Sequence, residues 1–521
     1  MSSITVTYGS TYTSSTSPAW PSATLTGYIF NGFMYNGSTY KTSYTANTDY
    51  TPNAEGTTSV TFTASWTPIT YKLLFNGNGG KTTAGATTYY QTNDSATAGI
   101  TSSSNTMTNL TYDVTYTLLD NAFIRKNYLF LGWSTSSTAT SATYTNKQTR
   151  DNLTTTNGET VTYYAVWRDT YANHYSTPSG SGTSGDPYLI SSASNLAWIS
   201  NRAENGQSTS IYCKQTANID LSAYEWLPIG NGTNYFLGNY DGNGYTIKNM
   251  KITTISGVIR SGLGLFGYAS NATITNVKIL NGSGTIGATT GSSYYVGSVV
   301  GYAANTTVTN CTNYEEVIAL NDQAGGIVGE IAGGKISGCY NYGNVSGGLY
   351  VGGIIGQTSG TTTITNCYVK ANTTARSNYN SWGGCNGGIV GYAPSGTLTI
   401  TSCAFEGSLL YSESGSQTRQ GSMLGYTNGA TTKITDCYAN ATVNVTVSTS
   451  NVYGLCTGTA TVTDCVFVTN STKRCKGTSF TNWLITSDSR PVPAGLTWLA
   501  TGRIKVTSSS QITALGYTLV S

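Results

Sequence analysis

A short phrase that is repeated between Leu263 and Cys465 constrains the fold of this chain more than any other feature. A small residue, two apolar residues and a glycine are followed seven to nine residues later by an apolar residue, a hydroxyl residue, a short residue and a cysteine, as in Gly326-Ile-Val-Gly329 and Ile336-Ser-Gly-Cys339. The last position is filled in successive copies by Val277, Cys311, Cys339, Cys367, Cys403, Cys437 and Cys465, at spacings of 34, 28, 28, 36, 34 and 28 residues. Repetition at this period indicates a solenoid, and the glycines and short apolar pairs favour β-strands.

The cysteine position of the phrase is predicted to face the core. Eight of the ten cysteines lie between Cys311 and Cys465, which raises the alternatives of a disulfide framework or a metal cluster. However, Val277 fills the same position in the first copy, and a free cysteine packs as a small hydrophobic residue. No pair has the C-x-x-C spacing of a zinc or redox site. We therefore expect a ladder of buried thiols and no metal.

The residue before the ladder position is predicted to form a corner between two strands. This position holds Asn276, Asn310, Gly338, Asn366, Ser402, Asp436 and Asp464 in successive copies. Asparagine, aspartate and glycine tolerate the left-handed backbone conformation that a sharp corner requires.

The sequence before the repeats resembles the start of a known solenoid family. It contains Asp186-Pro-Tyr-Leu-Ile190, a helix predicted over Ser194–Arg202, and the turn Tyr240-Asp-Gly-Asn-Gly244. Together with the Gly-Gly-Ile-Val-Gly phrases, this resembles the GLUG-motif family of right-handed β-solenoids over about residues 186–470. The resemblance implies a solenoid domain at 186–480, whose first coil the helix would cover. Residues 481–521 break the repeat period and are predicted to form a C-terminal cap.

The N-terminal third resembles a different family. Residues 69–168 contain Ile69-Thr-Tyr-Lys-Leu-Leu-Phe75, Asn76-Gly-Asn-Gly-Gly80, Tyr128-Leu-Phe-Leu-Gly-Trp133 and Tyr164-Ala-Val-Trp167. These motifs resemble the Listeria–Bacteroides repeat, a small β-grasp-like module of bacterial surface proteins. Residues 68–168 are predicted to be one complete repeat and residues 1–67 a partial one, because the opening strand and its Asn-Gly-Gly are missing. A missing strand would leave a sheet edge that another subunit could cover.

The predicted fold class is therefore all-β. Two small β-grasp-like modules precede a right-handed β-solenoid (β-helix) with a short N-terminal capping helix and a C-terminal cap. Residues 169–185 include Thr177-Pro-Ser-Gly-Ser-Gly-Thr-Ser-Gly185 and are predicted to be a Gly/Ser linker, in which His174 is exposed and inert.

Composition excludes several functional classes. Only 9% of residues are charged and the net charge is +3, so long-range attraction to nucleic acid or anionic membrane is not expected. No run of 18 apolar residues is present, which argues against a membrane span. The first residues, Met1-Ser2-Ser3-Ile4, lack the pattern of a signal peptide.

The sequence indicates no catalytic constellation and no cofactor. Asp436 and Asp464 occupy the same corner position and would stack about 5 Å apart, but the other residues of that position are those of a turn. Glu315 and Glu316 are predicted to be solvated, and Asp241 is predicted to be a turn residue that could also bind calcium. We therefore expect that the protein is not an enzyme.

Aromatic side chains on outward loops are the candidate ligand-binding residues: Tyr294, Tyr295, Tyr340, Tyr342, Tyr379, Trp382 and Tyr411. Such residues could form a platform for sugars or for a protein receptor. The alternative is that tyrosine simply suits exposed strands.

The expected function is non-enzymatic attachment to a host-surface glycan or protein receptor. Both resemblances imply an extracellular protein of the bacterial surface, and the missing signal peptide would also suit a phage fibre or spike on a virion. A polysaccharide lyase or hydrolase and a structural lattice or filament subunit are the alternatives. A homo-oligomer or a neighbouring subunit is expected at the sheet edge of residues 1–67.

Overall fold

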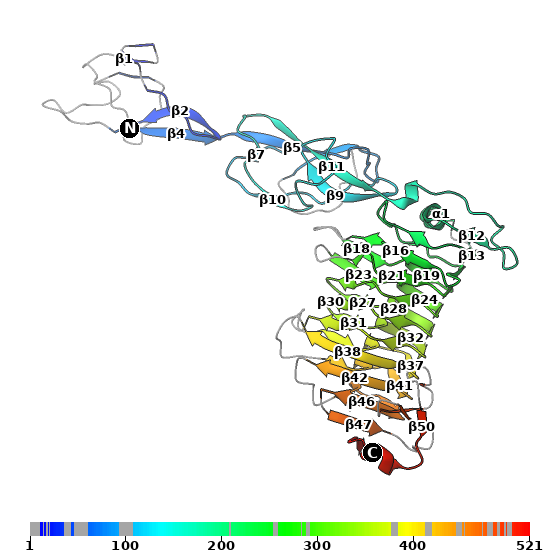
Figure 1. Cartoon of the computed structure of the whole chain (residues 1–521). Coiled ribbons are helices and arrows are strands. Elements are labelled where there is room, and N and C mark those ends of the chain that lie inside the picture. Colours follow the sequence, from blue (N-terminus) through cyan, green and yellow to red (C-terminus); the bar gives the residue numbers. More distant parts are fainter. Residues whose placement is uncertain are drawn as a thin grey trace. The chain divides into compact units, whose positions relative to one another are not determined.

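The structure, a computed structural model, divides the chain into two compact units (Figure 1). Unit 1 comprises residues 1–126 and 130–167, and unit 2 comprises residues 127–129 and 168–521. The residues described are 11–13, 15, 16, 19, 21–35, 43–45, 61–92, 108–207, 210–253, 259–282, 284–287, 292–376, 384–411, 419–443, 451, 452, 454–470, 472–476, 483–486, 490–493, 496 and 503–520.

Unit 1 contains small sheets. The largest has the strand order β6-β5-β11-β9, with β7 also paired to β5. Its strands are β5 (Thr70–Asn76), β6 (Thr88–Tyr90), β7 (Leu110–Thr111), β9 (Tyr128–Ser134) and β11 (Thr160–Asp169), and β11 is parallel to β5. The two-stranded sheets are β1 (Thr11–Tyr12) with β3 (Tyr44–Thr45), β2 (Tyr28–Met34) with β4 (Thr63–Pro68), and β8 (Tyr116–Thr117) with β10 (Thr149–Arg150).

Aromatic side chains form the core of this unit. The Phe75 and Trp133 ring centroids are 4.5 Å apart, and Tyr89 lies 5.1 Å from Phe75. In the first module, Trp66 packs on Phe30 at 5.2 Å. Phe130 packs on Trp167 at 5.5 Å, so the Phe30–Trp66 and Phe130–Trp167 pairs of the two sequence motifs are packed in a similar way. The assignment to Listeria–Bacteroides repeats remains a prediction.

Unit 2 is a parallel β-solenoid, and the predicted all-β fold class is confirmed. Sheet 1 runs through β12 (Tyr188–Ile190), β13 (Tyr212–Gln215), β15 (Asn239–Asp241), β19 (Phe266–Ser270), β20 (Thr273–Thr275), β24 (Val300–Thr309), β28 (Val328–Ser337), β32 (Ile355–Thr365), β36 (Val390–Ala393), β37 (Thr397–Thr401), β40 (Leu424–Thr427), β41 (Thr431–Thr435), β43 (Asn451–Val452), β44 (Cys456–Thr457) and β45 (Thr461–Thr463). Its coils are stacked in sequence order, from green to orange in Figure 1.

Two further sheets complete each coil. Sheet 2 runs through β14 (Ile219–Asp220), β16 (Thr246–Lys248), β17 (Lys251–Ile252), β21 (Lys278–Leu280), β22 (Thr285–Gly287), β25 (Thr312–Asn313), β26 (Val317–Ala319), β29 (Tyr340–Asn341), β30 (Val345–Gly347), β33 (Tyr368–Val369), β34 (Thr373–Ala375), β38 (Ala404–Tyr411), β42 (Tyr438–Val443), β46 (Cys465–Thr469), β47 (Thr472–Lys476) and β51 (Thr518–Val520). Sheet 3 runs through β18 (Ile259–Leu263), β23 (Ser292–Gly297), β27 (Gln323–Gly325), β31 (Tyr350–Gly352), β35 (Cys385–Gly387) and β39 (Arg419–Gly421).

The repeated phrase connects sheet 3 to sheet 1 through a close backbone contact. A Cβ atom added to Gly329 would lie 2.5 Å from the backbone of Tyr295 and of Val296 in the preceding coil. Gly301, Gly356, Gly391 and Gly425 have equivalent backbone neighbours at 2.6–2.8 Å. Only glycine allows the two strands to approach this closely, which explains why the phrase keeps it in every one of these copies.

The predicted corners are confirmed. All seven residues of the corner position have positive φ angles, between 50° and 61°: Asn276, Asn310, Gly338, Asn366, Ser402, Asp436 and Asp464. They lie between a strand of sheet 1 and the following strand of sheet 2.

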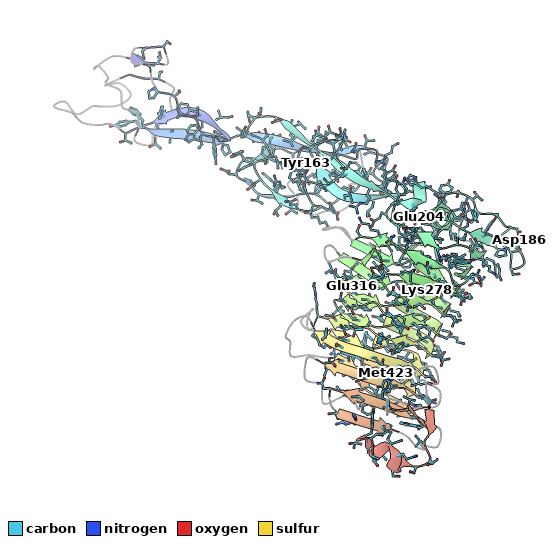
Figure 2. All side chains as sticks on the ribbon, viewed as in Figure 1. Tyr163, Asp186, Glu204, Lys278, Glu316 and Met423 are labelled. Atoms are coloured by element: carbon cyan, nitrogen blue, oxygen red, sulfur yellow. The ribbon has the colours of Figure 1, made fainter. Side chains whose placement is uncertain are left out.

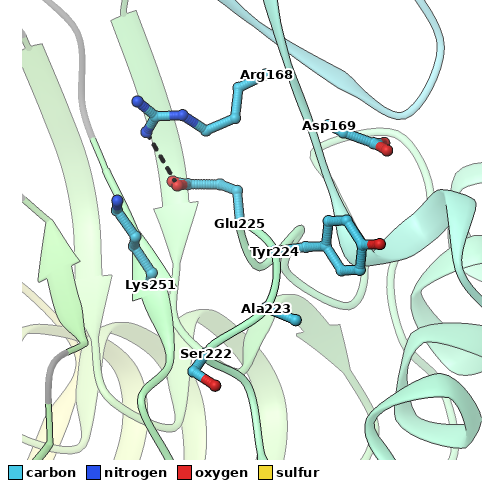
Figure 3. Close-up of a pocket in the computed structure, with 7 residues that line it drawn as sticks. All are labelled: Arg168, Asp169, Ser222, Ala223, Tyr224, Glu225 and Lys251. Carbon is cyan, nitrogen blue, oxygen red and sulfur yellow. Dashed lines mark hydrogen bonds and ion pairs between the residues drawn. The ribbon is translucent and has the colours of Figure 1, made fainter.

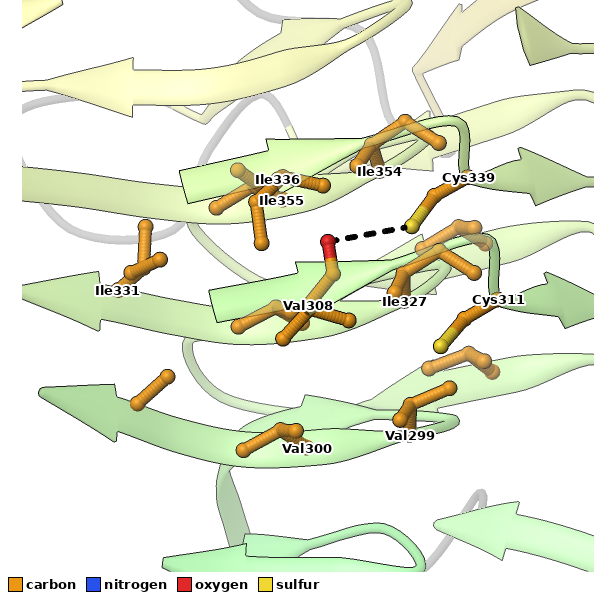
Figure 4. Packing of buried hydrophobic residues seen from close by; sticks show 14 of the residues in the cluster. Val299, Val300, Val308, Cys311, Ile327, Ile331, Ile336, Cys339, Ile354 and Ile355 are labelled. Atoms are coloured by element: carbon orange, nitrogen blue, oxygen red, sulfur yellow. Dashed lines mark hydrogen bonds between the residues drawn. The ribbon is translucent and has the colours of Figure 1, made fainter. Parts of the chain in front are cut away.

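The ladder side chains lie in the core, as expected. Val277, Cys311, Cys339, Cys367, Cys403, Cys437 and Cys465 are all 0% exposed, and the described cysteines are free thiols. Figure 4 shows Cys311 and Cys339 at the same position of successive coils, beside Val308 and Ile336, with the Cys339 Sγ 3.7 Å from the Val308 carbonyl oxygen. Met423, labelled in Figure 2, is also fully buried in this stack. Burial raises the pKa of ladder thiols such as that of Cys311.

The first coil is covered by α1 (Ala193–Glu204), as predicted. The Ser192 side chain caps it by accepting a hydrogen bond from the Asn195 backbone N–H, and Leu196 and Ile199 join the solenoid core. The helix therefore closes the apolar end of the stack.

Residues 169–185 are not the free linker that their composition predicts. The 3₁₀ helix η1 (Tyr171–Asn173) places Tyr171 in the solenoid core at 4% exposed. The Leu189 N–H donates to the Ser179 carbonyl, and the Tyr212 N–H donates to that of Gly182. A Cβ atom at Gly182 would lie 2.3 Å from the Tyr188 ring, so this glycine serves close packing instead of flexibility.

A small second core ends the stack. Strand β47 runs antiparallel to β46, which interrupts the parallel coils. Strands β48 (Trp483–Thr486), β49 (Pro491–Pro493) and β50 (Arg503–Lys505) form an antiparallel sheet, followed by α2 (Ser509–Thr513). Buried Trp483, Leu496 and Ile512 pack together at this end of the solenoid.

We expect Asn310→Ala to lower the free energy of unfolding by about 1 kcal/mol, because alanine is strained in the left-handed conformation that Asn310 adopts, with a φ of 54°. Asn310→Gly is the matched control and should be nearly neutral. Urea denaturation of both variants provides the measurement. Equal destabilisation by both substitutions would show that the side chain, and not the backbone conformation, is what the corner requires.

Because the ladder thiols are fully buried, we expect native protein to react slowly with Ellman's reagent. Unfolding in denaturant without reductant should release the ladder thiols for rapid titration. Recovery of far fewer free thiols would contradict the buried, unpaired ladder.

Candidate functional site

Side chains from sheets 1 and 3 form two neighbouring lines across the coils that are rich in tyrosine, and we call these two lines the tyrosine stripe. On sheet 1, parallel pairing places side by side Tyr268, Tyr302, Glu330, Gln357, Tyr392 and Tyr426, each the residue after the last glycine of a phrase. On sheet 3, the neighbouring line contains Tyr295, Gln323, Tyr350 and Arg419. Six coils at roughly 4.8 Å give the stripe a length of about 25 Å.

Four tyrosines form one end of the stripe. The Tyr295 ring lies 5.4 Å from that of Tyr302 and 6.3 Å from that of Tyr268, and Tyr235 packs edge-on against Tyr268 at 5.5 Å. Tyr295 has a φ of 54°, which is rare for an aromatic residue. The preceding coil has Gly262 at the equivalent position, also with positive φ, and the Tyr268 ring lies over it.

Three stacked tyrosines form the other end. The Tyr350 and Tyr392 rings are stacked at 4.6 Å, and Tyr392 and Tyr426 at 5.7 Å with an interplanar angle of 3°. The Arg419 guanidinium lies 4.5 Å from the centre of the Tyr426 ring. These tyrosines are half-buried, so each ring keeps part of its surface open to solvent.

Two carboxyl groups and an amide lie between the two ends, and we call Asp322, Gln323 and Glu330 the acid centre. Gln323 is 5% exposed and Glu330 is 9% exposed. The Gln323 Nε2 donates to Glu330 Oε2 at 3.1 Å and to the Gln357 Oε1 at 3.3 Å. Burial raises the pKa of Glu330 to about 7, with a further contribution from Asp322, and burial raises the pKa of Asp322 to about 6.

The candidate aromatic residues fall into three groups. Tyr295 is part of the stripe, and Tyr294 precedes it on β23. Tyr340 and Tyr342 follow β28 and lie on sheet 2, where the exposed Tyr314 and Tyr342 rings are stacked at 4.8 Å. Tyr379 and Trp382 are outside the described residues.

Tyr411 was expected on an outward loop, and this expectation is wrong. The residue ends β38 and is 6% exposed, and its hydroxyl donates to the Gly384 carbonyl at 3.1 Å. Because strand side chains alternate, Tyr411 shares the inward face of β38 with Leu409.

Four candidate carboxylates outside the acid centre lie at corners and turns or accept hydrogen bonds from the backbone. Asp436 and Asp464 are corner residues, and the pKa of Asp436 is raised by burial and by the neighbouring Asp464. Asp241 accepts hydrogen bonds from the Asn243 N–H and the Asn276 amide, as a turn residue would. Glu315 is not solvated as predicted, since it is 6% exposed and accepts a hydrogen bond from the Gly282 N–H.

A separate pocket of about 220 Å³ lies in unit 2 near α1 (Figure 3). Arg168 and Glu225 pair across it at 3.2 Å, and Thr253 also donates to Glu225. His174, expected to be exposed and inert, pairs with Asp169 at 2.7 Å and stacks on Tyr224 at 3.7 Å. The pocket is smaller than typical ligand pockets, and its acids are already paired. We therefore regard it as structural.

The described residues include neither a candidate membrane-spanning helix nor a candidate metal-binding group. No helix among them has the length and apolarity needed to cross a bilayer. No group of three or more His, Cys, Asp or Glu side chains in the described ranges is arranged to bind a metal ion.

Comparisons with known proteins agree with a GLUG-containing solenoid. The family described as the GLUG motif matches residues 292–313 and 347–374, which include Tyr295, Tyr302 and Tyr350 of the stripe. The chain is 37% identical over 164 residues to halomucin of Haloquadratum walsbyi, covering 29% of this chain and 2% of halomucin. It is 33% identical over 131 residues to a protein of Evansella cellulosilytica named as a Gly-rich membrane protein, covering 22% of this chain and 14% of that protein.

One solved structure is also similar. It is a protein of Bacteroides ovatus named as an immunoglobulin A1 protease, with a TM-score of 0.42 and 20% identity over 61% of this chain and 94% of that one. This similarity is too low to carry an argument about fold or function. The chain spans only a small part of the two curated relatives described above.

The raised pKa of Glu330 in the acid centre predicts that the folded protein becomes less stable as the pH rises. The folded state raises the pKa of Glu330 from 4.5 to about 7, so it holds the proton more tightly than the unfolded state does. Stability should therefore fall as pH rises from 4.5 to about 7. Glu330→Gln should remove this contribution and be more stable than the wild type by about 3 kcal/mol at about pH 8.

Thermal unfolding at about pH 5 and pH 8 is the measurement, where the two proteins should converge at the lower pH. The groups facing Glu330 are Tyr268, Tyr295, Tyr302 and Asp322. Glu316→Gln, at an exposed position, is the control and should show no such difference. A Glu330→Gln protein that is less stable at the higher pH would contradict the burial effect.

Proposed function

We propose that this chain is a non-enzymatic attachment protein of a cell surface, and that the tyrosine stripe binds extended glycans. Unit 2 serves as a stiff rod, because its coils are hydrogen-bonded to their neighbours along two long sheets and, from β18 to β39, along a third sheet. The names of the similar proteins, halomucin and a Gly-rich membrane protein, suit a surface location.

The stripe is the observation that carries this proposal. Aromatic faces favour the C–H-rich faces of sugar rings, and amide and carboxyl oxygens accept hydrogen bonds from sugar hydroxyls. The stripe contains both kinds of group in one line, with half-buried rings at each end and Gln323, Gln357 and Glu330 between them. A chain of sugars laid along this line would contact several coils at once.

Glycan cleavage at the acid centre is the second candidate function. Glu330 has a pKa of about 7, which suits a general acid near neutral pH, and Asp322 lies close enough to affect it. This candidate requires product release from a bound polysaccharide. Size-exclusion analysis of polysaccharides incubated with the protein would detect it.

Removal of single stripe tyrosines should weaken glycan binding. We expect Tyr302→Ala and Tyr392→Ala each to reduce affinity roughly fivefold, since one aromatic contact contributes about 1 kcal/mol. A glycan array would identify the ligand, and titration calorimetry with the best oligosaccharide would measure the effect.

Tyr342→Ala is the matched control, because Tyr342 is an exposed tyrosine on sheet 2, away from the stripe. Its affinity should equal that of the wild type. Loss of binding only in Tyr342→Ala would instead place the site on sheet 2, and a protein that binds no glycan would contradict the proposal.

A further inference from the structure

The acid centre interrupts the tyrosine stripe in the middle. On sheet 1, Glu330 takes the position that Tyr302 holds in the preceding coil, and Gln357 takes it in the next. On sheet 3, Gln323 lies next to Tyr350. On sheet 1, two adjacent coils therefore present an acid and an amide where the coils on either side present tyrosines.

Hydrogen-bonding capacity at the acid centre is unused. The Gln323 amide nitrogen is occupied by Glu330 and Gln357, but its Oε1 is buried without a hydrogen-bond partner, and so is the Oδ1 of Asp322. Buried polar atoms without partners cost free energy. Both unused atoms are acceptors, so a donor would satisfy them.

The negative charge of the acid centre is also uncompensated. In the described part of the chain, neither Asp322 nor Glu330 forms an ion pair with a lysine, arginine or histidine. Partly buried carboxylates without a counter-charge are unfavourable, so a cation that enters here gains both attraction and hydrogen bonds.

The surrounding aromatic rings favour an organic cation. Tyr295 and Tyr302 lie near Glu330, and both Tyr295 and Tyr350 lie near Asp322. The faces of such rings attract ammonium groups, and several tyrosines around a carboxylate resemble the cages that bind alkylammonium ions.

We propose that the acid centre binds the ammonium group of a cationic amino sugar, so that the stripe selects glycans that carry positively charged nitrogen groups. This inference rests on the proposed function. Glu330 and Asp322 supply the counter-charge, Gln323 Oε1 accepts a hydrogen bond from the sugar, and the tyrosines on either side contact the neighbouring sugar units.

Two matched ligands test whether the stripe binds cationic sugars more tightly than neutral ones. They are β-1,4-linked glucosamine oligomers of equal length, one fully N-acetylated and the other fully N-trimethylated, whose charge does not depend on pH. Titration calorimetry is done with the full chain at about pH 8, where both carboxyl groups are ionised. We expect the cationic oligomer to bind at least about tenfold more tightly.

Glu330→Gln and Asp322→Asn should each remove most of the preference for the cationic oligomer over the N-acetylated one. Glu316→Gln is the control and should keep the full preference. Thermal unfolding establishes that each variant is folded.

Each of the other possible results of these titrations contradicts a specific part of the proposal. Equal affinity of the wild type for the two oligomers overturns the inference and leaves the glycan-binding function standing. Binding of neither oligomer nor any other glycan overturns that function and the inference with it. A preference that survives in Glu330→Gln and Asp322→Asn overturns the assignment to the acid centre, and equally tight binding of a lysine oligomer overturns the sugar as the ligand class.

Discussion

The hydrogen-bonded register between successive coils is the constraint on which the rest of unit 2 depends. Parallel pairing places equivalent residues about 4.8 Å apart, so a position of the repeated phrase becomes a line of side chains. Tyr302 beside Glu330 and Ile274 beside Val308 are two such neighbours, one at the surface and one in the core. The left-handed corner residues and the close glycine contacts maintain this register in coils whose lengths differ.

Because of this register, the core could be predicted from the sequence. Val277 in a position otherwise held by cysteine was enough to predict an apolar, inward-facing ladder, and the seven ladder residues are fully buried. The exchange of Asn310 for Gly338 at the corner likewise predicted the left-handed backbone that both residues have. The burial of the ladder position and the backbone conformation of the corner position depend on the residue types allowed there. Seven copies of each position were therefore sufficient to predict both features.

Contacts between sheets could not be read in the same way. Gln323 and Glu330 are in contact because the chain turns from sheet 3 to sheet 1 near Ile327. The sequence pattern instead favoured a functional site in the irregular loops. The signal was nevertheless present in the residue after the last glycine of each phrase, where Glu330 and Gln357 interrupt a run of tyrosines. The packing of Tyr171 into the first coil was missed for a similar reason, since glycine-rich composition alone does not distinguish a flexible segment from a closely packed one.

Because the chain contains few charged residues, few side chains could compensate the charge of the acid centre. With only 9% charged residues, the surface of this chain offers few side chains that could screen or pair with a carboxylate. A buried acid pair then has two ways to avoid its electrostatic cost, which are to take up protons or to bind a cation. The raised pKa values of Asp322 and Glu330 are the first response. The tyrosine faces around them favour the second, because they attract an ammonium group but offer a proton no additional contact.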